Sequence, residues 1–127
     1  MATKNLAPGF LKNPQNLMVF HGPSTGLEIV VDQKVIARTK SPIILEEGGY
    51  PLIYYIPRKD VRMYLLKKTN QTTYCPFKGT ATYWMLKKSD SLSTDIAWSC
   101  ETTYLEAKSI ETCLSFHILN TIERNFF

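Results

Sequence analysis

Short apolar segments recur along most of the chain, separated by Gly, Pro, Asp or Ser. These segments are rich in Val, Ile, Tyr and Thr and recur roughly every 8 to 12 residues, a spacing typical of all-β folds. We predict strands over residues 17–20, 27–31, 34–39, 42–46, 52–56, 80–86 and 94–99. Asp32 and Gln33 stand between two of these segments and predict a two-residue hairpin. The segment 52–56 is apolar throughout, which predicts a strand buried on both faces.

The C-terminal region fits two periodicities. Apolar residues stand at helical spacing at Ala107, Ile110, Leu114 and Ile118, yet Leu114, Phe116 and Ile118 also alternate with polar residues, as in a strand. We predict a short helix over residues 104–111 and a final strand over residues 113–119. His117 alternates with the apolar residues of that strand, so we expect it on the opposite side of the strand from them.

Three further segments lack strand periodicity. Residues 69–73 are polar and predict a loop, and Asp60 is a candidate N-cap for a brief helix. Residues 1–16 hold two prolines and a glycine and predict an extended N-terminal arm. The predicted architecture is therefore mainly β, a compact single domain of short antiparallel strands over residues 17–127 with one or two short helices.

The composition is that of an ordinary globular protein. Apolar residues make up 44% of the 127 residues and charged residues 20%, which argues against disorder. No apolar run approaches the roughly 20 residues that a membrane-spanning helix needs, and the first ten residues lack the apolar core of a secretory signal. Three cysteines are an odd number and too few for a disulfide scaffold, so we expect reduced thiols in a cytoplasmic protein.

The net charge of +4 allows a polyanionic partner but does not require one. Basic residues stand in pairs at Arg58-Lys59, Lys67-Lys68 and Lys87-Lys88, spread along the chain, and no nucleic-acid-binding motif is present. We therefore expect neither nucleic acid nor a membrane as a partner. The sequence leaves the oligomeric state open.

The most distinctive segment is residues 74–79 (YCPFKG). Pro76 restricts its own φ and biases Cys75 toward an extended backbone, and Gly79 can adopt φ values that other residues avoid. A shaped loop that presents a thiol and the amine of Lys78 suits a functional site. A small buried Cys75 and a solvated Lys78 would give the same sequence.

A second cluster lies at residues 54–60 (YYIPRKD), downstream of Glu46 and Glu47. Arg58 and Asp60 would project on the same side of an extended backbone, which would bring a cation and a carboxylate together. The alternative is a surface ion pair in which Asp60 caps a helix.

Three segments occur in a specific order along the chain. They are residues 54–61 (YYIPRKDV), residues 72–84 (TTYCPFKGTATYW) and residues 97–99 (AWS). Together they resemble the family named domain of unknown function 427, over roughly residues 27–118. The resemblance implies a compact, β-tent-like domain with one short helix and a set of family residues around one cavity. Carried over to this sequence, those residues are Glu46, Tyr55, Arg58, Asp60, Cys75, Lys78, Tyr83 and Trp98.

Some members of this family are labelled nucleotidyltransferase. Such enzymes normally hold phosphates at a Gly-Ser helix N-terminus and Mg²⁺ with paired carboxylates. This chain has no Asp-x-Asp sequence, and residues 24–26 fit a turn better than a phosphate-binding loop. We therefore do not expect this activity, and the sequence calls for no cofactor.

The cysteines and histidines predict no metal site. A Cys₃His set would consist of Cys75, Cys100, Cys113 and His117, but no two cysteines form a close C-x-x-C pair. In a strand, Cys113 and His117 would lie about 13 Å apart, too far to share one ion, whereas in a helix they would lie one turn apart and could share it.

A cysteine-dependent enzyme that uses Cys75 is one functional hypothesis. It would need a base, and neither His21 nor His117 belongs to the motif, although Lys78 or Arg58 would stabilise a thiolate. The candidates for a catalytic role are Cys75, Lys78 and Asp60.

The leading hypothesis is a mixed-charge pocket that binds, with or without transforming it, a small anionic molecule. Arg58 and Lys78 would bind the anionic group. Glu46 or Asp60 would orient Arg58 or handle a proton. The walls would be Tyr55, Tyr83 and Trp98. The alternative from another class is a non-enzymatic protein-interaction module whose aromatic-rich strands recruit a protein.

Overall fold

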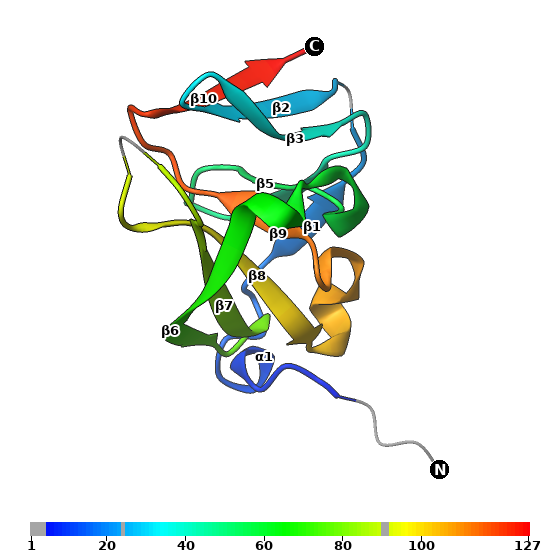
Figure 1. The fold of residues 1–127 in the computed structure, drawn as a ribbon. Helices are drawn as coiled ribbons and strands as arrows, with labels where there is room; N and C mark the ends of the chain where they lie inside the picture. Colours follow the sequence, from blue (N-terminus) through cyan, green and yellow to red (C-terminus); the bar gives the residue numbers. More distant parts are fainter. Residues whose placement is uncertain (1–4, 24, 90–91) are drawn as a thin grey trace.

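The computed structural model describes residues 5–23, 25–89 and 92–127. They form a single, mainly β domain with three small antiparallel sheets (Figure 1). The first sheet has the order β1-β4-β5, with β1 (Met18–His21), β4 (Ile43–Glu47) and β5 (Ile53–Tyr55). The second has the order β10-β2-β3, with β10 (Ile122–Phe126), β2 (Leu27–Val31) and β3 (Lys34–Thr39). The third has the order β6-β7-β8-β9, with β6 (Leu66–Cys75), β7 (Gly79–Leu86), β8 (Asp95–Thr103) and β9 (Leu114–Phe116).

The helical segments are short. They are α1 (Gly9–Lys12) and the 3₁₀ turns η1 (Arg58–Asp60), η2 (Met63–Leu65) and η3 (Leu105–Ile110). The helix predicted over residues 104–111 corresponds to η3. None of the helices in the described ranges is long and apolar enough to cross a membrane.

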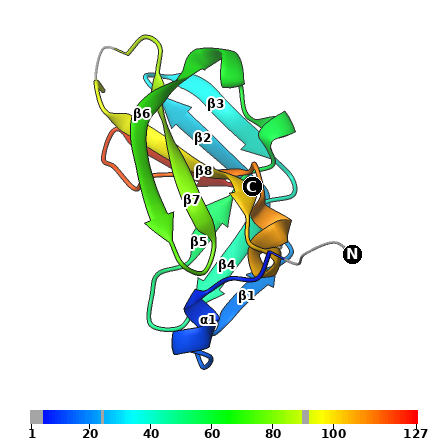
Figure 2. The ribbon, with the colours of Figure 1, turned by 90° about the horizontal axis from the view of Figure 1, so that it is seen from below.

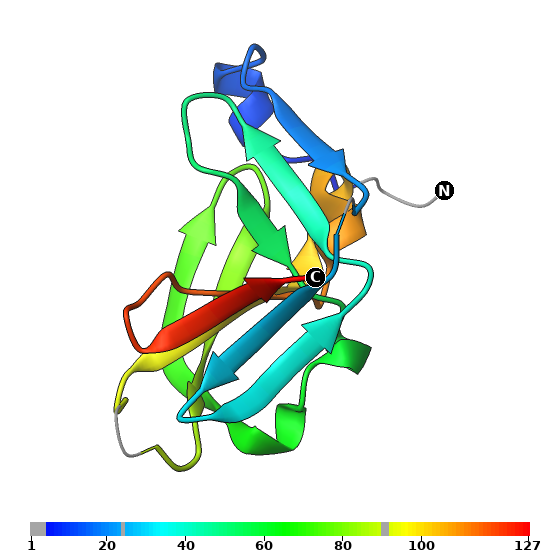
Figure 3. The same cartoon turned by 90° about the horizontal axis from the view of Figure 1, so that it is seen from above.

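The two three-stranded sheets are neighbours, and the four-stranded sheet lies beside both. The view from below shows the β1-β4-β5 sheet next to the β10-β2-β3 sheet (Figure 2), and the view from above shows the same arrangement (Figure 3). Ile56 and Leu114 join the end of β5 to β9 through paired backbone hydrogen bonds of 2.7 and 2.9 Å. Both residues are fully buried in the main core, which lies chiefly between the β10-β2-β3 sheet and the four-stranded sheet.

Strand alternation builds this core. Leu27, Ile29 and Val31 point inward along β2, and each is 1% exposed. A smaller cluster packs η3 against β4 and β5 and consists of Leu45, Tyr55, Ala107, Ile110 and Cys113. The predicted hairpin at residues 32–33 is confirmed: Asp32 and Gln33 have φ values of 51° and 64°, as a two-residue turn with both φ values positive requires.

Several expectations about single segments were wrong. Residues 69–73, predicted to be a loop, belong to β6, which is an edge strand with mostly exposed side chains. Only residues 114–116 of the predicted final strand 113–119 are extended as β9, and the chain then forms the unpredicted β10. Asp60 ends η1 and caps no helix, because its carboxylate accepts a hydrogen bond from Thr39 instead.

The N-terminal segment also differs from the extended arm predicted over residues 1–16. In its described part the chain forms the helical turn α1, at the bottom of Figure 1. Phe10 of this turn packs edge-on against Phe77, with ring centroids 4.9 Å apart, and Gly9 N donates a hydrogen bond of 2.9 Å to Pro76 O. The turn therefore covers the YCPFKG segment. Residues 1–4 lie outside the described ranges.

Candidate functional site

The YCPFKG segment is the tip of the β6–β7 hairpin. Cys75 and Gly79 face each other as the last paired residues, and Lys78 N donates to Cys75 O at 3.3 Å. Gly79 has a φ of 125°, and a Cβ there would lie 2.9 Å from both Cys100 Sγ and Thr102 O. Only glycine fits this backbone so close to β8. The motif therefore fixes the position of the Lys78 side chain.

A cavity of about 630 Å³ borders this hairpin. Its walls come from the hairpin tip, the end of β4 and the loop that follows it, and strands β2, β5, β8, β9 and β10. Of the residues that the sequence predicted for the site, Cys75, Lys78 and Trp98 line the cavity. Most of its lining is apolar, with side chains such as Leu27, Ile29 and Phe116.

Lys78 and Glu47 form an ion pair in the cavity wall. Lys78 Nζ lies 3.4 Å from Glu47 Oε1, and the two side chains are only 18% and 12% exposed. Glu47 ends β4, so the pair ties the β6–β7 hairpin to the first sheet. The sequence had named the neighbouring Glu46, which instead lies on the surface and contacts His21 at 2.9 Å.

His117 lies in the cavity wall beside Trp98. Their ring centroids are 5.0 Å apart, and His117 Nε2 lies 3.2 Å from Asp95 Oδ2. The ring also stacks on Tyr83, at 6.2 Å between centroids and 12° between planes. His117 does lie on the opposite side of the last strand from Leu114, but that side faces the cavity. The predicted position of His117 opposite the apolar residues therefore brings it to the cavity.

Asp95 orients the imidazole of His117 and lies outside the cavity lining. Partial burial opposes ionisation of Asp95, but hydrogen bonds from His117 and Thr94 outweigh it, so the pKa of this carboxyl lies below its ordinary value. The carboxylate thus stays ionised at neutral pH. A histidine oriented in this way by a carboxylate is a possible acid–base group or hydrogen-bond donor for a molecule in the cavity.

Arg58 lies on the other face of the four-stranded sheet. Its Nε donates to Thr112 O at 2.9 Å, and its Nη2 lies 2.5 Å from Glu101 Oε2. Trp84 Nε1 and Arg58 both approach Ser99 Oγ, at 2.9 and 3.4 Å. Ser99 follows Trp98 in β8, and consecutive strand residues point to opposite faces. The structure therefore separates Arg58 from Lys78, which the sequence had placed together.

The remaining predicted residues support the walls rather than line them. Asp60 accepts a hydrogen bond of 2.7 Å from Thr39 and lies outside the cavity. Tyr55 is 1% exposed, and burial raises the pKa of its hydroxyl, partly offset by a hydrogen bond with Trp98. Tyr83 shares a hydrogen bond of 2.7 Å with Thr73 and backs the ring of His117.

Cys75 and His117 lie at opposite ends of the cavity. Cys75 pairs with Gly79 of β7, and Gly79 pairs with Thr103 of β8, so Cys75 lies at the level of Thr103 along the sheet. His117 N donates a hydrogen bond to Ile96 O, so His117 lies at the level of Ile96. Seven positions of β8 separate these two levels, a separation on the order of 20 Å at about 3.3 Å per residue. Direct proton transfer needs roughly 3 Å between heavy atoms, so His117 is not placed to act as a base for Cys75.

The other cysteines are enclosed. Cys100 and Cys113 are buried, whereas Cys75 is half-buried. Burial raises the pKa of both enclosed thiols; a hydrogen bond with the Thr102 backbone partly offsets this at Cys100, as does nearby Arg58 at Cys113. Over the described ranges, no group of three or more His, Cys, Asp or Glu side chains converges as a metal site would require.

Sequence reasoning missed Glu47, His117 and Arg124, all of which line the cavity. Arg124 lies on β10, which was not predicted, and its position becomes visible only once that strand is paired with β2. The alternation of Ile122, Arg124 and Phe126 is the one signal that could have indicated it.

One family model matches the chain, over residues 21–123. Its label refers to nucleotide transfer, which is a name rather than an observed activity. No curated protein matches the chain. The model describes a domain of unknown function (DUF427), and because it covers most of the sequence, the chain belongs to that family.

Proposed function

We propose that this domain binds a small anionic molecule in the cavity beside the β6–β7 hairpin. The observation that carries the proposal is the cavity itself, about 630 Å³ with mostly apolar walls and a few charged side chains. Small-molecule sites typically enclose roughly 300 to 1,000 Å³ and combine apolar walls with a few placed polar groups. The cavity fits this description in both size and lining.

The lining residues suggest the roles within the site. Trp98 supplies a flat apolar wall, Lys78 with Glu47 supplies a charged pair at the hairpin end, and His117 supplies a nitrogen near Trp98. Arg58 takes a structural role in this proposal, because Glu101 and the carbonyl of Thr112 already occupy its guanidinium.

The alternatives that the sequence left open have less support. A cysteine-dependent enzyme would need a base beside Cys75, and His117 lies at the other end of the cavity. A protein-interaction module would present most of its motif aromatics outward. Tyr74 is 58% exposed, but Trp98 faces the cavity and Tyr55 is 1% exposed.

A thermal-shift screen tests the proposal. The panel contains aromatic and aliphatic carboxylates, sugar phosphates, nucleotides and neutral analogues of each. A ligand at 100 times its Kd stabilises a protein by about 2.7 kcal/mol, which for a chain of this length raises Tm by roughly 10 °C. We expect at least one anion to raise Tm and its neutral analogue to have a smaller effect.

Two matched variants locate the binding. Leu52→Glu places a negative charge at the cavity wall, and Leu11→Glu makes the same change on α1, outside it; the two leucines are 45% and 86% exposed. We expect Leu52→Glu to remove the Tm rise and Leu11→Glu to leave it intact. A panel in which no compound raises Tm, or a rise that survives Leu52→Glu, contradicts the proposal.

A further inference from the structure

Arg124 points toward the core side of its sheet. It pairs directly with Ile29 across the β10–β2 ladder, and directly paired residues project on the same face. Ile29 is 1% exposed, and Ile122, two positions before Arg124 on the same face, is 7% exposed. A strand face with these neighbours normally carries an apolar residue, because a charge there loses contact with water. Arg124 avoids this cost by lying in the cavity wall.

Within the described ranges, no carboxylate lies within ion-pair distance of Arg124. Its guanidinium carbon lies 5.7 Å from the centre of the Tyr54 ring, a cation–π contact. The other cation in the cavity wall, Lys78, is already paired with Glu47, and Arg58 on the far face is paired with Glu101. The positive charge at the cavity that remains to be balanced is therefore that of Arg124.

The surroundings of Arg124 are apolar. Tyr54 lies against its guanidinium and Ile29 pairs with it across the strands, and both line the cavity together with Leu27 and Phe116. A guanidinium presents parallel N–H donors that match the two oxygens of a carboxylate or sulfonate. An apolar wall next to such a donor fits a molecule that carries one anionic group on an apolar or aromatic body.

We infer that Arg124 is the residue of the cavity that recognises the anionic group, and that the ligand is an amphipathic anion with an aromatic or apolar body. This inference rests on the proposed function, and it assigns anion binding to Arg124 in place of Lys78 and Arg58. A rival explanation needs no ligand: β10 is an edge strand, and an inward-pointing charge on an edge strand discourages edge-to-edge association.

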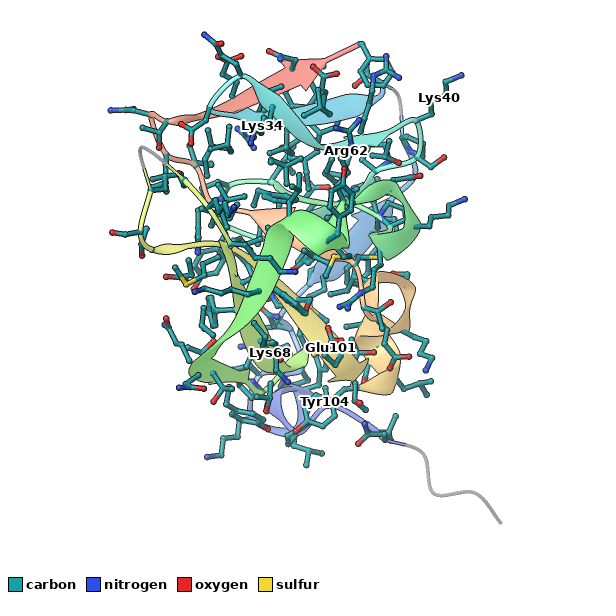
Figure 4. All side chains as sticks on the ribbon, viewed as in Figure 1. Lys34, Lys40, Arg62, Lys68, Glu101 and Tyr104 are labelled. Atoms are coloured by element: carbon teal, nitrogen blue, oxygen red, sulfur yellow. The ribbon has the colours of Figure 1, made fainter. Side chains whose placement is uncertain are left out.

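Two fluorescent dyes test the inference because they share an aromatic body and differ in charge. 8-Anilinonaphthalene-1-sulfonate carries a sulfonate, and N-phenyl-1-naphthylamine is its neutral counterpart. Arg124→Met keeps most of the apolar stem and removes the charge. The control is Arg62→Met, at an exposed arginine that hydrogen-bonds to Ile36 of β3, outside the cavity (Figure 4).

We expect Arg124→Met to weaken binding of the sulfonate dye by at least about tenfold, the loss of one charge-assisted contact, and to change the neutral dye less than about twofold. Arg62→Met should change neither. Arg124→Lys keeps the charge and should restore part of the sulfonate affinity. Arg124→Gln, which also removes the charge, serves in place of Arg124→Met if that variant does not fold by circular dichroism.

The outcomes separate the inference from the proposed function. If the native protein binds both dyes, Leu52→Glu weakens both, and Arg124→Met changes neither or both equally, the cavity binds ligands but Arg124 does not recognise the anion. If Arg124→Met only promotes self-association in sedimentation velocity, the edge-strand explanation holds. If the native protein binds neither dye, the proposed function fails and the inference fails with it.

Discussion

The two faces of the four-stranded sheet hold their charged groups in different ways. On one face Arg58 is enclosed by Thr112, Ser99 and Glu101, so its guanidinium has protein partners for its donors. Figure 4 labels Glu101, which lies in this view between β6 and η3. On the other face Trp98 and His117 border the cavity, whose wall also holds Arg124; among the described residues, the partner of this guanidinium is the aromatic ring of Tyr54.

This difference shows which cations of the chain already have protein partners and which have donors available for a ligand. A guanidinium with a full set of hydrogen bonds contributes to stability and would have to break them to bind a ligand. A guanidinium that lies over a ring at the wall of a cavity keeps its donors available. The predicted site had combined residues of both faces, and the structure divides it into a closed polar network and an open cavity.

The largest expected effect concerns the hairpin that both faces share. We predict that Gly79→Ala destabilises the fold by about 3 kcal/mol, because a φ of 125° is unfavourable for alanine and its Cβ would lie 2.9 Å from Cys100 Sγ and Thr102 O. Urea unfolding followed by circular dichroism measures this. Gly22→Ala is the control, since its Cβ would meet no atom within 4 Å. Equal stability of the two variants would show that the hairpin is not constrained as described.

The second effect tests the closed face directly. We predict that Arg58→Ala lowers the free energy of unfolding by about 2 kcal/mol, because Glu101 loses its cation and Thr112 O loses a donor, although partial exposure moderates the loss. Arg62→Ala, at an exposed arginine, should change it by less than about 0.5 kcal/mol.

Dye binding to the same variant separates a structural role of Arg58 from a role in ligand binding. The sequence alone predicted that Arg58 contacts the ligand, whereas the geometry predicts that folded Arg58→Ala binds the sulfonate dye as the native protein does. A folded Arg58→Ala protein that no longer binds the dye would restore the earlier prediction and remove the distinction between the two faces.

Local patterns were enough to predict the fold class and most strands, because these depend on neighbours in sequence. Alternation marked β2 and β3, and the positions of Asp32 and Gln33 marked their turn. The polar β6 carried no such pattern, since an edge strand with exposed side chains has no buried face to impose one.

The site was harder to predict than the fold because it depends on contacts between distant segments. Of the residues carried over from the motif, Cys75, Lys78 and Trp98 line one cavity. It could not show that Arg58 is on the far face, which follows from β8 alternation once Ser99 is known as its partner. Arg124 was not predicted for a similar reason, because its inward direction is set by pairing with Ile29, 95 positions earlier in the chain.

The smallest expected effect compares a thiol at the open cavity with a thiol in the closed interior. Cys75 is half-buried at the cavity, whereas Cys113 is buried in the cluster between η3, β4 and β5, and burial raises the pKa of Cys113. A raised pKa leaves less thiolate at neutral pH, and enclosure blocks the reagent. We predict that iodoacetamide modifies Cys75 at least about tenfold faster than Cys113, equivalent to about 1.4 kcal/mol in activation free energy.

Peptide mass spectrometry over a time course measures the two rates in the native protein, and Cys75→Ser confirms the assignment. In the open cavity a ligand that raises Tm should slow the reaction at Cys75 and leave the rate at Cys113 unchanged. If Cys113 reacted as fast as Cys75 in the folded protein, the interior near Arg58 would be open to small molecules as well. The contrast between Arg58 and Arg124 would then depend on their hydrogen bonds alone, and not on a difference in how easily small molecules reach them.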